Sequence, residues 1–385
     1  MVVSLAGSGA ETVSGRLGGD YPEFYGAGRI VLDGDGDGLY DAEVQARSQE
    51  GLFPEDDEPG HLDFAYPPAV AAGYALFALI PYRLSYVVHT LLAMLALALG
   101  IRALRPAVAG IRRHPWVAYA LALTAYPMFR AVGAGQNTPL TLLLIAAWWR
   151  WRWEGRPFLA GLAAGALLFK PQFAVLFLLA VLLDRSPRAL AGTATSAAAL
   201  WVVSAAVTGV GWVGKFVDHA LALPSRERDV ADTTGVSLTF VARDLFGDNT
   251  ATTVLASVLA VAVAGAALVV WARRRDMSAK LQMTGLGALA AATVLVPPHV
   301  IFYDAGLLVL TGAGLAAPDR RSDRSDWLLL YVASFSGLAA SALGANPLVF
   351  VALGGLVATH RLAGPTPGKK RESTDRVQRG GGHGR

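Results

Sequence analysis

The chain has 385 residues, of which 54% are hydrophobic and only 16% are charged, whereas a soluble domain carries about 25% charged residues. This composition excludes an ordinary soluble globule and indicates a membrane protein, and the absence of cysteine excludes disulfides, thiolate metal sites and a thiol nucleophile. The net charge of +4 comes from basic residues that lie mostly in short links between apolar runs, which is typical of membrane topology and not of nucleic-acid binding.

The segment before the first apolar run is acidic and is predicted to be an extracytoplasmic loop over residues 1–65. Between Asp20 and Asp63 there are thirteen acidic residues and only two basic ones. Residues 1–19 have the pattern of neither a signal peptide nor a membrane span. An external loop needs a preceding helix, so we expect the first transmembrane helix to be missing or to lie upstream of Met1.

Alternating Asp and Gly residues from Asp33 to Gly38 resemble the opening of a calcium-binding loop. The twelfth position of such a loop would be Val44, where calcium coordination requires a Glu. Two interpretations therefore stay open for this stretch, a flexible acidic turn and a cation site.

Apolar runs between residues 66 and 360 predict an all-α fold, namely a polytopic bundle of transmembrane helices. A short run at residues 66–80 is expected to form a juxtamembrane or re-entrant helix. Residues 209–249 are predicted to form an external loop, and residues 361–385 a disordered, basic cytoplasmic tail. The other predicted crossings are residues 85–101, 116–129, 140–149, 189–207, 252–271, 281–296, 305–317, 327–343 and 347–359.

The apolar run from Phe158 to Leu183 is interrupted by the sequence Lys170-Pro-Gln172. Proline lacks the amide hydrogen and disfavours helix at the residue before it, so the run forms either two half-helices or one kinked span. Ionisable residues at membrane depth are functional candidates by default. Lys170 could neutralise a lipid-borne phosphate, or it could extend its ammonium group to the interface.

Three polar residues cluster at a predicted helix mouth: His299, Tyr303 and Asp304. A His there could stabilise a phosphate leaving group or an acceptor oxygen, with Asp304 orienting it. The alternative is interfacial anchoring, which is natural for Tyr303.

Asp20, Gln136 and Asn137 are further candidates on the same side. Asp20 near an apolar wall suits a general base, although a solvated loop acid is the alternative. Gln136 and Asn137 could bind sugar hydroxyls or cap the following helix. When the arginine-rich links are placed inside the cell, these residues, Lys170, His299 and the 209–249 loop all face the outer side.

Several short motifs together resemble glycosyltransferase family 87, the polyprenyl-phosphate-mannose-dependent mannosyltransferases of the GT-C superfamily. Their order and spacing over residues 19–310 make the resemblance fairly specific. We expect the first transmembrane helix that this family places before the Asp to be missing or to lie upstream of Met1, and the Asp33–Gly38 run extends a loop that is usually short. The motifs are Gly19-Asp-Tyr with Tyr25, Tyr40-Asp41, Phe64-Ala-Tyr-Pro-Pro68, Gly135-Gln-Asn137, Gly161-Leu-Ala-Ala-Gly with Lys170-Pro-Gln, and Pro298-His299 with Tyr303-Asp304.

The resemblance implies a GT-C fold, an outward-facing active site in the plasma membrane and a polyprenyl-phosphate-linked sugar donor. Asp20 would be the catalytic base of an inverting transfer to a lipid or glycan acceptor, and Lys170 and His299 would hold the phosphate. Since phosphate is a stable leaving group, we expect neither a metal nor another cofactor. Side chains expected to shape the substrate pockets are Tyr25, Tyr66, Gln136, Asn137, Gln172, Tyr303 and Asp304.

Two alternatives stay open at this point. The family also includes arabinofuranosyltransferases of actinobacterial envelopes, so mannose is not the only sugar that the resemblance allows. A lipid or solute transporter would also have many apolar helices and a broken helix with a buried Lys. The large acidic external segment near Asp20 favours the enzyme.

Overall fold

The computed structural model describes residues 17–52, 61–226, 234–318, 323–339 and 346–363. These residues form helices and no β-strand; a single isolated bridge joins Gly235 to Ile301 within them. The predicted all-α fold is therefore confirmed. Residues 364–385 of the expected disordered tail, the segment before residue 17 and part of the acidic segment lie outside the described residues, whereas residues 361–363 of that tail are helical and end α21.

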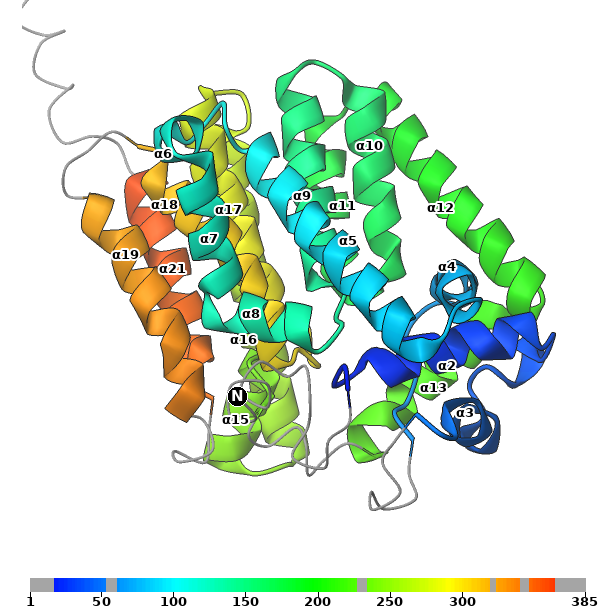
Figure 1. The fold of residues 1–385 in the computed structure, drawn as a ribbon. Coiled ribbons are helices and arrows are strands. Elements are labelled where there is room, and N and C mark those ends of the chain that lie inside the picture. Colours follow the sequence, from blue (N-terminus) through cyan, green and yellow to red (C-terminus); the bar gives the residue numbers. More distant parts are fainter. Residues whose placement is uncertain (1–16, 53–60, 227–233, 319–322, 340–345, 364–385) are drawn as a thin grey trace, which may run out of the picture.

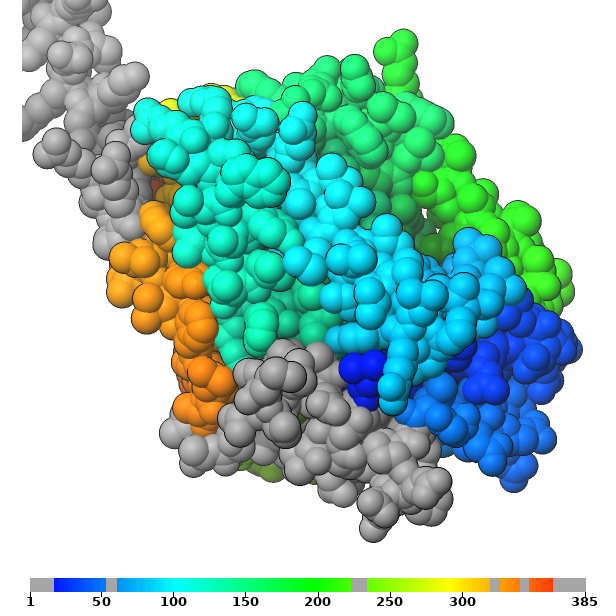
Figure 2. All heavy atoms as spheres, in the orientation of Figure 1, coloured from blue at the N-terminus to red at the C-terminus, as the bar shows by residue number. Residues whose placement is uncertain are grey.

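The acidic segment is folded against the first apolar helices, at the lower right of Figure 1. α2 packs along α4 and α3 packs on α2, around a core of aromatic side chains that includes Tyr21, Phe24 and Tyr74. In the space-filling view α2, α3 and α4 form one continuous surface with the neighbouring α5 (Figure 2). The elements here are α2 (Tyr21–Leu32), η1 (Gly36–Gly38), α3 (Ala42–Gln49), α4 (Pro68–Ala78) and α5 (Tyr82–Ala103).

The crossing predicted at residues 116–129 is wrong as a single helix. α7 ends at Thr124, Ala125 adopts an extended conformation, and α8 begins at Tyr126 with Pro127 in its first turn. Proline disfavours helical geometry at the residue before it, and its missing amide hydrogen is tolerated only in a first helical turn. The next elements are α6 (Ala109–Arg113), α7 (Pro115–Thr124), α8 (Tyr126–Gly133) and α9 (Thr138–Trp153).

The run interrupted at Lys170 forms two antiparallel half-helices, and the rival single kinked span is wrong. Both outer ends of this hairpin lie together, because Arg152 just before α10 forms an ion pair with Asp184 at the end of α11. Lys170 therefore lies at the turn, on the far side of the bundle from that ion pair. The elements are α10 (Pro157–Ala166), η2 (Leu167–Phe169), α11 (Pro171–Asp184) and the long α12 (Pro187–Thr208).

α10 and α12 approach closely through small residues. A Cβ atom on Gly161 would collide with the Ala189 carbonyl group of α12, so only glycine permits this contact. Small residues at helix contacts are typical of packing within a bilayer, where no hydrophobic driving force brings helices together. The Gly161 motif noted in the sequence thus has a packing role.

α17 lies at the centre of the carboxyl-terminal half. All of its residues from Met283 to Leu295 are buried. α16, α18 and α21 pack around it. Two shorter helices, α13 and α15, lie in the segment predicted as an external loop, at the bottom of Figure 1. The elements are α13 (Trp212–Arg226), α15 (Leu238–Phe246), α16 (Thr250–Arg274), α17 (Ala279–Leu295), η3 (Phe302–Leu307), α18 (Leu308–Ala316), α19 (Asp323–Ala333), η4 (Ser334–Ala339) and α21 (Leu348–Ala363).

Three of the described helices are long and apolar enough to cross a membrane. These are α5 and α12, with 22 residues each, and α16 with 25. At about 1.5 Å per residue they reach the thickness of a hydrocarbon core of about 30 Å. Their exposed sides carry large apolar side chains, including Leu91, Val202 and Val261. The chain is therefore a helical membrane protein.

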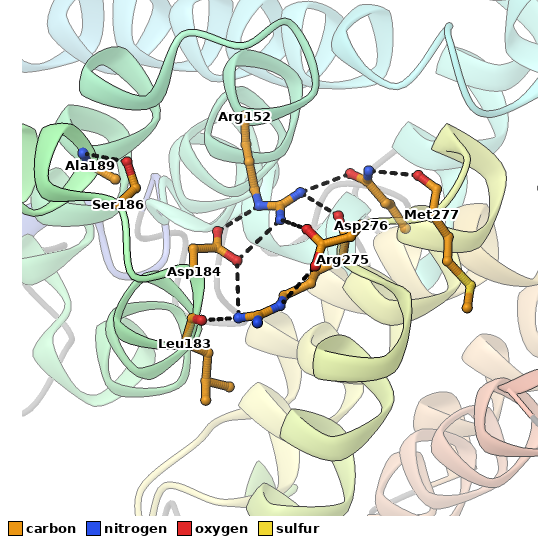
Figure 3. A network of polar contacts seen from close by, with 9 residues as sticks. Arg152, Leu183, Asp184, Ser186, Ala189, Arg275, Asp276 and Met277 are labelled. Atoms are coloured by element: carbon orange, nitrogen blue, oxygen red, sulfur yellow. Dashed lines mark hydrogen bonds and ion pairs between the residues drawn. The ribbon is translucent and has the colours of Figure 1, made fainter.

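The connections at the upper end of Figure 1, with the helix ends beside them, carry thirteen of the 33 Lys and Arg residues; we call this the basic end. It comprises the α5–α6, α9–α10, α11–α12 and α16–α17 connections. Figure 3 shows how Arg152 holds three of these connections together. Its guanidinium group contacts Asp184 at 2.5 and 3.1 Å, the Arg275 carbonyl oxygen at 2.6 Å and Asp276 at 3.3 Å.

Replacing Arg152 by Ala is expected to lower the free energy of unfolding by about 2–3 kcal/mol, because partly buried acceptors lose a charged donor. The matched control is Arg150→Ala, since Arg150 forms only an exposed i,i+4 pair with Glu154 and should contribute less than about 0.5 kcal/mol. Unfolding of both variants in detergent checks the prediction. An equal loss of stability in the two would contradict it.

Candidate active site

Asp20 is positioned by the start of α2 and the end of α8. Its backbone N–H donates a hydrogen bond of 3.0 Å to the carbonyl oxygen of Ala134. The following Gly135 has a φ of +73°, and a Cβ atom there would lie 2.7 Å from the Cβ atom of Tyr21. Glycine is required at this turn for both reasons. The turn brings Gln136 next to Asp20.

The Gln136 side chain links three functional candidates. Its amide nitrogen donates to the Asp20 carboxylate at 2.7 Å and to the Tyr303 hydroxyl at 3.1 Å, and its oxygen accepts from Tyr66 at 3.2 Å. Gln136 is only 2% exposed, so these bonds are shielded from water. We refer to Asp20, Tyr66, Gln136 and Tyr303, together with the ion pair of Lys170 and Asp304, as the polar cluster.

Lys170 and Asp304 form a buried ion pair. The ammonium nitrogen lies 2.7 Å from the Asp304 carboxylate, and the two side chains are only 3% and 7% exposed. Thr138 donates a second hydrogen bond to the same carboxylate oxygen at 2.9 Å. The Lys170 ammonium also lies over the rings of Tyr66 and Phe173, at 5.6 and 5.0 Å from their centroids. Lys170 therefore does not extend away from the protein in this structure.

Tyr66 connects the two halves of the polar cluster. Its hydroxyl bonds to Gln136 and its ring faces Lys170. Burial raises the pKa of the Tyr66 phenol well above its usual range, and the negative charges of Glu23 and Asp304 raise it further. The phenol therefore stays protonated, which lets it donate to the Gln136 oxygen.

Asn137 and Tyr25 lie beside the polar cluster, in the aromatic core. Asn137 accepts a hydrogen bond of 2.8 Å from Tyr74, whose hydroxyl also contacts His89. Asn137 makes no side-chain capping bond to α9, so the capping alternative is wrong for it. Tyr25 donates to the Ile80 carbonyl oxygen at 3.0 Å and is 8% exposed. Both side chains are therefore bonded within the aromatic core that packs beside the polar cluster.

His299 and Gln172 lie at the edge of the site. His299 is partly exposed and its ring lies 6.0 Å from Phe240 of α15. The segment around it is attached to the 234–237 segment, since Ser237 donates to the Pro298 carbonyl oxygen at 3.0 Å. The structure thus joins the predicted external segment to the His299 segment. Gln172 is exposed on the first turn of α11, two residues after Lys170.

Two charged residues near the site were not singled out from the sequence. Glu23 lies one turn after Asp20 on α2 and is 9% exposed, and the i, i+3 spacing was the available signal. Arg130 lies on α8 with its guanidinium carbon 5.0 Å from the centroid of the Phe302 ring. A lone Arg at the end of an apolar run was the signal for it.

The Asp33–Gly38 run does not form a cation cluster in the part of the chain that the structure describes, where no three acidic or His side chains converge. Asp33, Asp35 and Asp37 are exposed. Asp37 instead contacts Lys215 of α13 at 3.1 Å. The stretch is a turn that leads from α2 into η1.

An apolar cavity of about 710 Å³ begins next to the polar cluster. It lies between α7, α18 and α19 and reaches from Ala305 and Gly306 at one end to Arg113 and His114 at the basic end. Ala305 directly follows Asp304 in the chain. The arrangement thus joins an apolar channel, a buried ion pair and a partly exposed carboxylate.

A comparison with protein families finds a match over residues 64–298 to the family described as glycosyltransferase family 87. The matched range includes Tyr66, Gln136 and Lys170 and ends one residue before His299. Neither a curated protein nor a solved structure matches the chain.

Proposed function

The chain belongs to glycosyltransferase family 87, and we propose that it moves a mannosyl residue from polyprenyl-phosphate-mannose to a lipid or glycan acceptor. The family and the apolar helices make it a membrane glycosyltransferase. The family match favours this enzyme over the transporter alternative. We further propose that the reaction takes place on the outer face of the plasma membrane, with inversion at the anomeric carbon.

The polar cluster is the observation that carries the proposal. It links a partly exposed carboxylate, Asp20, to the buried Lys170–Asp304 pair through two residues. Gln136 bonds to Asp20 and to Tyr66, and the ring of Tyr66 faces the Lys170 ammonium group. A sugar transferase needs a base on one side of the anomeric carbon and a positive charge near the leaving phosphate on the other.

In the proposed reaction, an acceptor hydroxyl attacks the anomeric carbon of the donor. Asp20 takes the hydroxyl proton while the new glycosidic bond forms. The bond between the anomeric carbon and the phosphate oxygen breaks, and its electron pair leaves with the polyprenyl phosphate. Attack from the face opposite the phosphate inverts the configuration. Asp20 then releases its proton to water, which completes the cycle without an additional reactant or a metal.

Lys170 and His299 are proposed to hold the leaving phosphate, with Asp304 orienting Lys170. Tyr66, Gln136 and Tyr303 are proposed to position the sugar, because their polar atoms already converge beside Asp20. Gln172 would contact substrate at the exposed edge. Tyr25 and Asn137 would act by supporting this surface, since both are buried and bonded to other side chains or backbone.

The donor lipid is proposed to lie in the apolar cavity between α7, α18 and α19. Support comes from its position and lining, since it reaches Ala305, the residue after Asp304, and is lined mostly by Ala, Val and Leu side chains. The location of the site at the end opposite the arginine-rich connections supports an outer-face reaction, because Lys and Arg remain on the cytoplasmic side.

The test measures transfer from labelled polyprenyl-phosphate-mannose to endogenous acceptors in membranes that express the chain. We expect transfer that is absent from membranes without the chain and that persists in excess chelator. The same assay with a polyprenyl-phosphate-arabinose donor distinguishes the second sugar that the family includes. If membranes with verified levels of the protein transfer sugar from neither donor, the proposed donor class is overturned.

A further inference from the structure

We propose that Arg130 binds the phosphate of the lipid-linked donor, between the apolar cavity and Asp20. This inference rests on the proposed function and adds a phosphate-binding residue to it. An incoming phosphate is attracted most strongly by a cation near the site whose charge is not compensated by a carboxylate.

Lys170 is already compensated, because Asp304 lies 2.7 Å from its ammonium nitrogen and the pair is buried. A buried pair of opposite charges attracts a phosphate less than an uncompensated cation does. Arg130 has no carboxylate within ion-pair distance in the part of the chain that the structure describes. It is therefore the cation that carries an uncompensated charge beside the cluster.

The guanidinium group of Arg130 also has N–H groups that make no hydrogen bond within the described residues. One terminal nitrogen donates to the Tyr126 hydroxyl at 3.3 Å, while the Nε atom is shielded from water and has no hydrogen-bond partner. A guanidinium group carries five N–H donors in a planar fork, which matches the oxygens of a phosphate. A shielded donor without a partner is unfavourable, and a phosphate oxygen would satisfy it.

The position of Arg130 matches the order of groups in the donor. Along α8, Pro127 lines the apolar cavity, Arg130 follows one turn later, and Ala134 another turn later accepts the Asp20 N–H. Residues three and four apart share a helix face. The helix therefore runs from the cavity past Arg130 to Asp20, as a donor runs from lipid tail through phosphate to sugar.

Two aromatic rings hold the guanidinium group in place. Its carbon lies 5.0 Å from the centroid of Phe302 and 5.9 Å from that of Tyr126, and these rings are stacked on each other. Cation–π contacts of this kind restrict the side chain before the ligand arrives. Phe302 lies two residues before Asp304, so the charge is held close to the Lys170 pair.

The experiment measures binding of two ligands to the full chain in lipid nanodiscs, a polyprenyl monophosphate without sugar and the corresponding polyprenol. Arg130→Gln is expected to weaken binding of the phosphate about 10- to 100-fold, which is the effect of losing a charged hydrogen bond. Binding of the polyprenol should change less than about twofold. Arg130→Lys should fall between, since Lys keeps the charge but not the fork.

The matched control is Arg188→Gln, an exposed arginine at the basic end, which should leave both affinities unchanged. Wild-type phosphate affinity in Arg130→Gln would overturn the assignment of Arg130 alone. Equal weakening of both ligands in Arg130→Gln and Arg130→Lys would show a structural role and also overturn it. A wild-type chain that binds phosphate and polyprenol equally would instead overturn the donor class, and the inference with it.

Discussion

Replacing Asp20 by Asn is expected to lower the turnover number of sugar transfer by about 10²- to 10⁴-fold, which is the contribution of a positioned general base. Asn keeps the shape of the side chain and can still bond to Gln136, whose amide has both a donor and an acceptor. The fold and the KM for the donor should therefore change little. Initial rates of mannosyl transfer by the purified chain, over a range of donor concentrations, check the prediction.

The matched control is Asp33→Asn, which removes an exposed carboxylate at the other end of α2. This variant should transfer at the wild-type rate. If Asp20→Asn also keeps the wild-type turnover number, Asp20 is not the base. Glu23, the buried carboxylate one turn further along α2, would then be the next residue to test.

Removing one partner of the Lys170–Asp304 pair is expected to destabilise the protein by about 3–5 kcal/mol, because the remaining charge stays buried without its counter-ion. Among the described residues, the Asp304 carboxylate in Lys170→Met would keep the Thr138 hydroxyl as its remaining donor. In Asp304→Leu the Lys170 ammonium would, within the same residues, keep its aromatic contacts and no counter-ion. Thermal and denaturant unfolding in detergent measures both losses.

The double variant Lys170→Met with Asp304→Leu separates the structural role of the pair from its role in transfer. Replacing both charges by apolar groups of similar size is often neutral for stability, so the double variant should be more stable than either single one. Its sugar transfer should nevertheless be lost if Lys170 holds the leaving phosphate. A stable double variant that transfers at the wild-type rate would show that the pair only holds the helices together.

Much of the candidate site could be recognised from local sequence. Lys170 was conspicuous because a charged residue and a proline interrupt an apolar run, and the structure confirms the two half-helices that this interruption allows. Gln136 and Asp304 were recognisable as polar residues beside apolar runs, on the side of the membrane predicted to be external. The split of the run at residues 116–129 was missed, although Pro127 was the available signal.

The connections within the site could not be predicted. Gln136 bonds to Asp20 across 116 residues of sequence, and Lys170 pairs with Asp304 across 134. Tyr25 was expected to contact substrate, yet its hydroxyl is bonded to the Ile80 backbone. Arg130 becomes notable only when Asp304 is seen to compensate Lys170. Each of these facts depends on which helices pack side by side, and local pattern does not contain that information.

The sequence by itself determined the class of the protein and most of its helical segments. In a bilayer every backbone group must be satisfied within its own segment, so long apolar runs specify helices locally. The tertiary structure decided which polar side chains meet and which cation keeps an uncompensated charge. These depend on side-chain packing between residues that are distant in the chain, where a shift of one residue along a helix turns a side chain by about 100° and removes the contact.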